Sequence, residues 1–186
     1  MGFGDFYRVQ REIIPVYGAA EVLAYCGGVF SFMHHSEVVM TPYEQVDICG
    51  MGVTVFPVMH DTPTYGVRIE VDGAVFVYSC DTTDQLSEET LAVMKNADLL
   101  LLDGIFPPEV QISKHMNIRE AERLAERLSP KEFWCVHMSH KIWWSYEYGA
   151  RDMQIWDLAR PDITFFERPH PPPAKLTTFS QYQHIR

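Results

Sequence analysis

The fold of this chain is set by the stretch Val53-Thr54-Val55-Phe56-Pro57-Val58-Met59-His60, an apolar run of strand type that ends at a histidine. Two later runs end in a similar way: residues 74–80 are followed by Asp81, and residues 133–136 are followed by His137. If the three runs are neighbouring strands of one sheet, their carboxyl ends bring two imidazoles and one carboxylate to a single edge. In open α/β sheets that edge is where ligands bind. The repeated placement therefore predicts a metal site of hydrolytic type.

The composition is that of one globular domain. At 186 residues the chain fits a single domain, residues 1–186, and its 47% hydrophobic content allows a proper core. The net charge of -10 argues against nucleic-acid binding, which needs Lys and Arg on phosphates, except where RNA is the substrate. We see no signal peptide and no apolar run of about 20 residues, so we expect a cytoplasmic protein without membrane contact. The four cysteines form no CxxC pair and are expected to be reduced.

Two local patterns predict secondary structure most clearly. Asp72-Gly73 separates two apolar runs of strand type, which is a strong signal for a β-hairpin. Residues 118–128 have one apolar face, with Asn117 and Glu120 at capping-box spacing before it and Pro130 after it, as is typical of a helix. Other patterns predict a strand at 13–17, a helix at 19–32, strands between 46 and 80, a helix at 87–96, and strands at 98–103 and 163–166. Together they predict one α/β unit without a linker.

Each candidate ligand also has a structural interpretation. A histidine after a strand is more often a hydrogen-bonded structural residue, and Asp81 could cap a turn with Thr82 and Thr83. Taken together, however, two imidazoles and a carboxylate suit zinc, manganese or iron. A carboxylate shared between two cations could also lower the pKa of a bridging water.

Several segments resemble the metallo-β-lactamase superfamily. Residues 58–69 resemble the segment around its third metal motif, residues 78–82 the motif with a bridging aspartate, and residues 97–104 the strand after it. Residues 136–140 resemble the last metal motif. His115-Met116-Asn117, with Glu120-Ala121, resembles the phosphodiesterase branch, which includes ribonuclease Z and the cyclic phosphodiesterase of phosphonate breakdown.

The resemblance implies an α/β fold of the αββα metallo-β-lactamase-like sandwich type and a role for each matched residue. His60 would ligate one metal, His137 the other, and Asp81 would bridge them. His115 would not be a ligand; it would lie by the substrate phosphate and donate a proton or stabilise charge, unless it is only a surface histidine before a helix. The implied reaction is hydrolysis of a small or cyclic phosphodiester by metal-bound hydroxide, with zinc or manganese as cofactor and with Asp81 and His115 as catalytic residues.

One departure from the family pattern changes what is expected of this chain. The signature HxHxDH, which supplies most metal ligands, is absent from the sequence, and His34-His35-Ser36-Glu37 lacks its spacing. Residues 1–7 resemble the stretch that follows the signature, so the chain resembles the carboxyl-terminal two-thirds of such an enzyme, an N-terminally incomplete sandwich. With so few ligands for two cations, we expect weakly bound or absent metal and an impaired hydrolase.

The same departure leaves a second class of function open. Loss of strands from the first sheet would expose a sheet edge and an apolar face, which favours a homo-oligomer. The alternative to an enzyme is a non-catalytic interaction or structural protein on this scaffold, or a half-enzyme that a separate chain completes.

Overall fold

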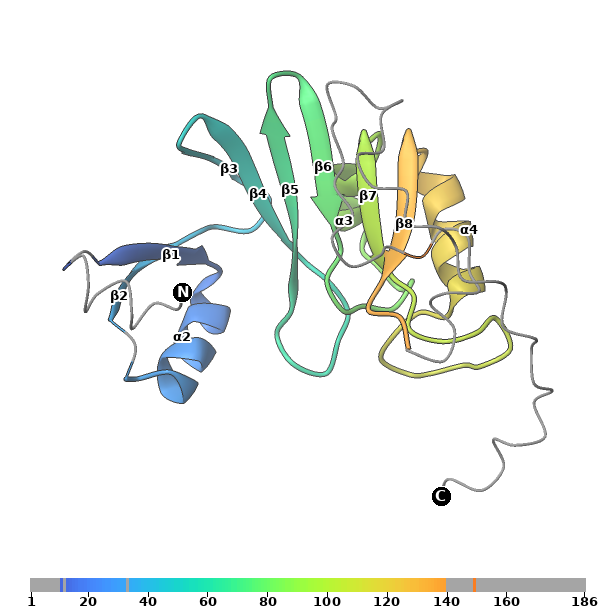
Figure 1. The fold of residues 1–186 in the computed structure, drawn as a ribbon, viewed down its shortest axis with the longest axis horizontal. Helices are drawn as coiled ribbons and strands as arrows, with labels where there is room; N and C mark the ends of the chain where they lie inside the picture. The colour runs from blue at the N-terminus through green and yellow to red at the C-terminus, as the bar shows by residue number, and fades with distance from the viewer. Residues whose placement is uncertain (1–10, 12, 33, 140–148, 150–186) are drawn as a thin grey trace, which may run out of the picture.

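The computed structural model describes residues 11, 13–32, 34–139 and 149, and shows a mixed α/β fold (Figure 1). Its helices are α2 (Ala20–Val29), α3 (Glu88–Met94) and α4 (Ile118–Leu128). Its strands are β1 (Ile14–Gly18), β2 (His35–Val39), β3 (Gln45–Ile48), β4 (Met51–Pro57), β5 (Tyr65–Val71), β6 (Ala74–Tyr78), β7 (Leu99–Asp103) and β8 (Glu132–Val136). The expected α/β class is therefore confirmed. The predicted strand at 163–166 lies outside the described residues.

Six strands form one large sheet in the order β3-β4-β5-β6-β7-β8. Strands β3 to β6 pair antiparallel, whereas β6, β7 and β8 run parallel. Because two antiparallel steps separate β4 from β6, strand β4 points in the same direction as β6, β7 and β8. The carboxyl ends of these four strands therefore lie at one edge of the sheet.

The three runs that precede the candidate ligands are confirmed as strands of one sheet, but they are not neighbours. Strand β5 lies between β4 and β6, and strand β7 lies between β6 and β8. The three strands still end at a shared edge, because β4, β6 and β8 point in the same direction despite the intervening strands. The strand order also places the end of a further strand, β7, in the middle of the predicted site.

Two tight hairpins shape the antiparallel half of the sheet. Asp72 (φ 50°) and Gly73 (φ 81°) connect β5 to β6, which confirms the hairpin predicted from the Asp-Gly pair. Cys49 (φ 56°) and Gly50 (φ 83°) connect β3 to β4. Positive φ at both central residues gives the turn a twist that matches the flanking strands, so these two positions hold the register of the sheet.

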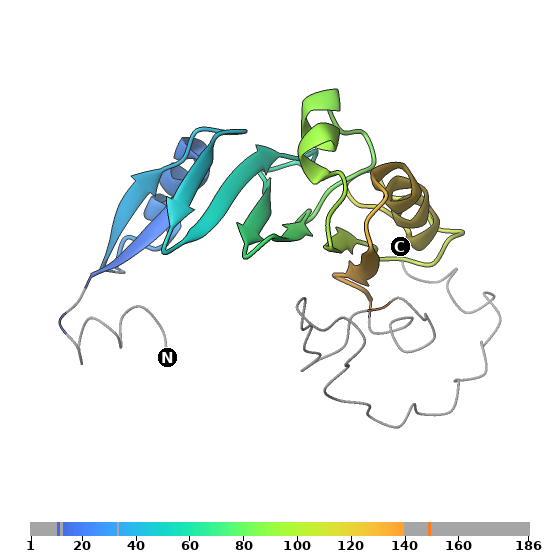
Figure 2. The same ribbon diagram turned by 90° about the horizontal axis from the view of Figure 1, so that it is seen from above.

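Helices α3 and α4 pack on the same face of the large sheet (Figure 2). Helix α4 has the bounds that the sequence predicts, because Asn117 and Glu120 form the capping box and Ser129 ends the helix in a left-handed conformation (φ 52°). The core between this face and the helices consists of fully buried side chains from both layers, among them Phe56, Val77, Met94, Leu100, Leu124 and Leu128. This core fixes β6, β7 and β8, and with them the edge where the candidate ligands lie.

The first three elements form a smaller unit, in which β1 and β2 pair in parallel and α2 connects them. Figures 1 and 2 show this unit beyond the β3 side of the large sheet, away from α4. The strand at 13–17 and the helix are confirmed, although α2 ends at Val29 rather than at Phe32. The unit contacts the large sheet where the Tyr65 hydroxyl donates a hydrogen bond to Glu21.

Among the described residues, no helix is both long enough and apolar enough to cross a membrane.

Candidate metal centre

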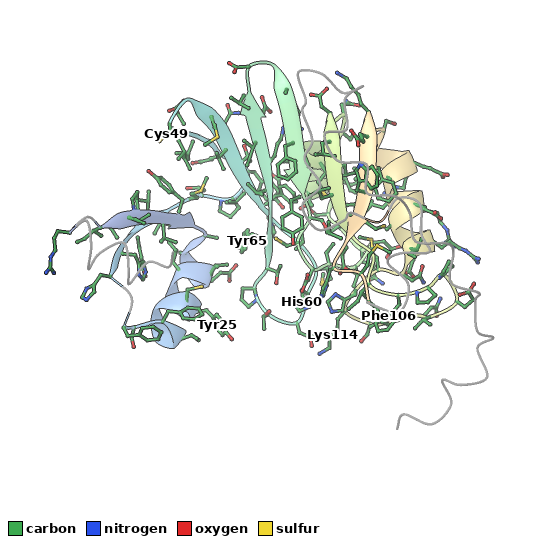
Figure 3. All side chains as sticks on the ribbon, in the orientation of Figure 1. Tyr25, Cys49, His60, Tyr65, Phe106 and Lys114 are labelled. Atoms are coloured by element: carbon green, nitrogen blue, oxygen red, sulfur yellow. The ribbon has the colours of Figure 1, made fainter. Side chains whose placement is uncertain are left out.

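The carboxyl edge of the large sheet gathers the polar side chains that follow its strands. Asp81 lies shortly after β6, Asp103 is the last residue of β7, and His137 directly follows β8. The loops after β4 and β7 bring His60 and His115 to the same edge, and Figure 3 labels His60 there, close to Lys114. All the site residues predicted from the sequence therefore lie at one edge.

The backbone turns sharply where β6 and β8 end. Cys80, directly before Asp81, and His137 both have left-handed φ angles, 55° and 57°. Such values are uncommon for residues other than glycine and are concentrated at functional sites, where surrounding contacts hold them. In this chain the two turns let the strands stop abruptly, and the following side chains stay at the edge of the sheet.

Asp81 and His137 contact each other directly, and His115 lies between the two other histidines. Asp81 Oδ1 is 3.0 Å from His137 Nδ1. The ring centroid of His115 is 5.1 Å from that of His60 and 5.0 Å from that of His137, and both ring pairs meet edge to face. His115 is thus a central member of the group and is not only a residue at its border.

Asp103 is the site residue that the sequence interpretation missed. It is fully buried, and its Oδ2 accepts hydrogen bonds from the Thr82 amide (3.0 Å) and from His115 Nδ1 (2.7 Å). Its Oδ1 has no hydrogen-bond partner within the described part of the chain and lies 3.7 Å from His137 Nδ1. The available signal was a charged residue that ends the buried run at 98–103, at the same edge as the other candidates.

Burial controls the ionisation of the groups around Asp103. It raises the pKa of Asp103 above its ordinary value, and the hydrogen bonds from Thr82 and His115 oppose this shift only in part. Burial, together with the Asp81 carboxylate, also raises the pKa of the Cys80 thiol. Cys80 is also not a member of the compact group of possible ligands among the described residues.

The loops that carry His60 and His115 are joined by an ion pair. Lys114, next to His115, pairs with Asp61, next to His60, and both side chains are about half exposed. His60 Nδ1 faces the Thr62 hydroxyl at 3.4 Å and the Thr62 amide at 3.5 Å. One ring nitrogen of His60 is thus directed back toward its own loop, which leaves the other nitrogen for contacts with the rest of the site.

The residues at this edge fit a divalent cation. Asp81, Asp103, His115 and His137 each offer one ligand atom, and these atoms lie within 4.8 Å of one another. Carboxylate and imidazole together suit zinc and manganese. A buried carboxylate oxygen without a partner is costly, and a cation at this place would satisfy Asp103 Oδ1. Among the described residues, His60 is not a member of this compact group, whereas the unexpected Asp103 is.

Comparison with known families identifies the class of protein. The model of the beta-lactamase superfamily domain matches residues 2–138, which is well over half of the chain. The chain therefore belongs to this family, and the resemblance of its motifs to the metallo-β-lactamase superfamily is confirmed. The fold of the family implies a divalent metal, and the compact group at the sheet edge is where the described residues could hold it.

Solved structures with the same fold are longer than this chain. YhfI of Bacillus subtilis, a metallo-beta-lactamase fold protein, has a TM-score of 0.62 and 22% identity over 72% of this chain and 55% of its own. A diphosphatase of the PhnP family has a TM-score of 0.62 and 21% identity, over 73% of this chain and 51% of its own. Human tRNase Z, short form, has a TM-score of 0.58 and 15% identity, over 72% of this chain and 63% of its own. Such identities show the fold alone, and the chain spans between 51% and 63% of these three structures.

The comparison with curated proteins gave no match.

Proposed function

We propose that this protein is a metal-dependent hydrolase of phosphodiesters, with small or cyclic phosphodiesters as its substrates. The observation that carries the proposal is the meeting of Asp81, Asp103, His115 and His137, which come from four separate segments, at one edge of the sheet. Two proteins of similar fold, a diphosphatase and a tRNase, are named for the cleavage of phosphate-containing compounds. Their names favour a phosphoryl substrate over the thioesters and lactams that the fold could also accommodate.

Asp81 and His137 would hold the cation, zinc or manganese, because their donor atoms are adjacent and both side chains are partly exposed toward solvent. When bound, such a cation supplies positive charge for the phosphate oxygens and lowers the pKa of coordinated water. The motif assigns His60 to the same task, but among the described residues the compact ligand group does not include it, although its ring lies beside that of His115 at the same edge.

His115 would act on the substrate, as a proton donor to the leaving oxygen or as a group that stabilises negative charge on the phosphate. Its Nδ1 is bound to the buried Asp103, so the carboxylate fixes the orientation of the ring and leaves Nε2 for the substrate. An imidazole held in this way can donate a proton to the leaving oxygen or stabilise negative charge on the phosphate. Asp103 thereby acts on the substrate through His115.

The charge of the chain favours a small substrate. A long RNA requires Lys and Arg along its phosphates, whereas this chain has a net charge of -10. A small phosphodiester needs only the few contacts available at the sheet edge. RNA is retained as a competing substrate in the test below.

Hydrolysis of bis(p-nitrophenyl) phosphate with added zinc or manganese tests the proposal. We expect slow, metal-dependent turnover by the 186-residue chain. Asp81→Ala should abolish turnover, because it removes a charge that holds the cation. His115→Ala should lower the rate about 10²–10⁴-fold, the usual contribution of a positioned acid or base. Glu126→Ala, on an exposed position of α4, is the matched control and should leave the rate unchanged.

Two further substrates make the assay decisive. A 2′,3′-cyclic nucleotide and a short RNA, each measured with the same variants, separate the small-substrate proposal from the RNA alternative. Turnover that Asp81→Ala and His115→Ala leave intact would contradict the site. Hydrolysis of a thioester or lactam together with inactivity on every phosphodiester would contradict the substrate class.

A second candidate function is supported by exposed apolar side chains on and around α2, among them Tyr25 and Phe32. They favour a non-catalytic interaction protein, or a half-enzyme, on the same scaffold. A folded chain that shows no metal-dependent turnover on any of these substrates would support this candidate over the enzyme.

A further inference from the structure

We propose that Asp103 is a metal ligand, and that Asp81, Asp103 and His137 hold a single divalent cation without His60. The inference deepens the proposed function and rests on its metal requirement, but it concerns metal binding and not turnover. A chain that binds one cation through Asp103 and hydrolyses nothing would uphold it while the proposed function fails.

The unpartnered oxygen of Asp103 is the first observation that points to a cation. Asp103 is fully buried, and its Oδ1 has no hydrogen-bond partner among the described residues. Almost all buried polar atoms have a partner, and leaving one unpaired is costly, more so for a charged group. This oxygen faces His137, at 3.7 Å from Nδ1, and so points into the group of candidate ligands. A cation there would satisfy it.

The distances between the donor atoms are the second observation. Around His137 Nδ1, Asp81 Oδ1 lies at 3.0 Å and Asp103 Oδ1 at 3.7 Å. Two ligands that bind one zinc ion at about 2.0–2.2 Å in tetrahedral geometry lie roughly 3.4 Å apart. The longer of the two separations exceeds a hydrogen bond but is close to this spacing. These two separations, with all the donor atoms of the group within 4.8 Å of one another, are compatible with ligation of one ion.

Asp103 is also held firmly enough to act as a ligand. Its other oxygen, Oδ2, is held by the Thr82 amide and by His115, and its own amide donates to Ser79 Oγ at 3.1 Å. Thr82 is fixed in turn, because its hydroxyl accepts a hydrogen bond from the Met59 amide. Such support restricts the carboxylate to one orientation, which favours metal affinity. His115 contacts Asp103 through Oδ2 alone, so it lies outside the proposed coordination shell while it helps to hold the carboxylate.

The charges match a single cation better than two. Two carboxylates supply two negative charges, which balance one divalent ion at a partly buried site. A second ion would need further charged ligands, and the compact group contains none besides Asp81 and Asp103 among the described residues. His60 has no carboxylate to supply negative charge, and among the described residues it lies outside the group. The family pattern of one metal on His60 and another on His137 is thus replaced by one shared site.

Metal titration of the full chain tests this inference. The metal-stripped protein is titrated with Zn²⁺ by calorimetry and with Co²⁺ by visible absorption, and we expect one ion per chain. Asp103→Asn keeps the shape and an acceptor for Thr82 but removes the charge, so metal affinity should fall more than ~100-fold, beyond the ~10–100-fold typical of a residue outside the coordination shell. His115→Gln should lower the affinity within that smaller range. His60→Ala should leave the stoichiometry and affinity unchanged.

Several results would overturn the inference. They are the absence of metal binding by the wild-type chain, two ions per chain, a loss below ~100-fold in Asp103→Asn, or a loss of the ion in His60→Ala. X-ray absorption of the zinc-loaded wild-type chain keeps the test independent of whether Asp103→Asn folds. We expect scattering from one imidazole and no second metal at ~3.5–4 Å, the spacing of a two-metal site. Two or more imidazoles, or a metal–metal signal, would contradict the proposal.

Discussion

At the scale of the residue, Asp98 shows how one carboxylate ties the parallel strands together and makes stability depend on pH. It accepts a hydrogen bond from the Val75 amide (2.7 Å) and pairs with Lys131, so it links the starts of β6, β7 and β8. The hydrogen bond from Lys131, followed by that from Val75, holds the pKa of Asp98 below its usual range. A lowered pKa means that the carboxylate stabilises the fold above its unfolded pKa, about 3.9, and that this stabilisation is lost as pH falls through the folded value.

We therefore expect Asp98→Ala to lower the free energy of unfolding by about 1–3 kcal/mol at pH 7, because the Val75 amide loses its acceptor. The difference from wild type should narrow as the pH falls from about 4, the unfolded pKa, through the lower pKa of Asp98 in the folded state. Urea denaturation at a series of pH values measures both effects. Asp98→Asn, which keeps an acceptor but no charge, is the matched control and should be the milder change at pH 7. A difference that stays constant with pH would contradict this account of Asp98.

At the scale of the element, helix α4 depends on the cap of its first turn, Asn117, which lies two residues after His115. Asn117 is buried; its side chain accepts from the Glu120 amide and donates to the Val110 carbonyl, each at 3.0 Å. Asn117→Ala should lower the free energy of unfolding by about 1–2 kcal/mol, since it removes the cap. Chemical denaturation measures the change, and Glu126→Ala on the exposed face should stay within about 0.5 kcal/mol of wild type. Equal effects of the two substitutions would show that the cap is not what holds the helix.

The elements differ in how far the sequence predicts them, and the reason is physical. The bounds of α4 follow from local signals, because the cap, the apolar face and Pro130 are all read within a few residues. Strand β2 was not predicted, because His35–Val39 is mostly polar or exposed and becomes a strand only through its pairing with β1. Sequence patterns thus identify elements that stabilise themselves and miss those that a distant partner stabilises.

At the scale of the whole molecule, the shared edge of the sheet was predictable but its inner details were not. The sequence predicts His60, Asp81 and His137 as site residues because each follows an apolar run. It predicts His115 through the resemblance of residues 115–117 to a family motif. Asp103 was missed, because its importance comes from complete burial and from an unpaired oxygen, neither of which a sequence displays. The interleaving of β5 and β7 between the other strands is likewise a property of the assembled sheet. The extent of a single domain over residues 1–186 stays a prediction.

The surface of the smaller unit leads to a prediction about assembly. Exposed apolar side chains gather on α2 and its flanks, and Figure 3 labels Tyr25 there, on the side away from α4. The members of this association surface are Ile13, Tyr25, Val29, Phe30, Phe32 and Val39. Exposed apolar side chains in such number favour association, and the parallel pair of β1 and β2 also has unpaired strand edges within the described residues. We therefore expect the chain to form a homo-oligomer through this surface.

Sedimentation velocity over a range of micromolar concentrations tests this expectation. The wild-type chain should sediment as an oligomer that dissociates on dilution, and Phe32→Glu combined with Tyr25→Lys should shift it to the monomer, because charges would have to be buried at the contact. Val71→Lys introduces a charge at an exposed apolar position of β5, outside the association surface, and should leave the oligomer intact. The paired variant should keep the unfolding midpoint of the monomer, since both side chains are already exposed. A wild-type chain that remains monomeric at every concentration would contradict the expected homo-oligomer, and an oligomer that persists in the paired variant would place the contact elsewhere on the molecule.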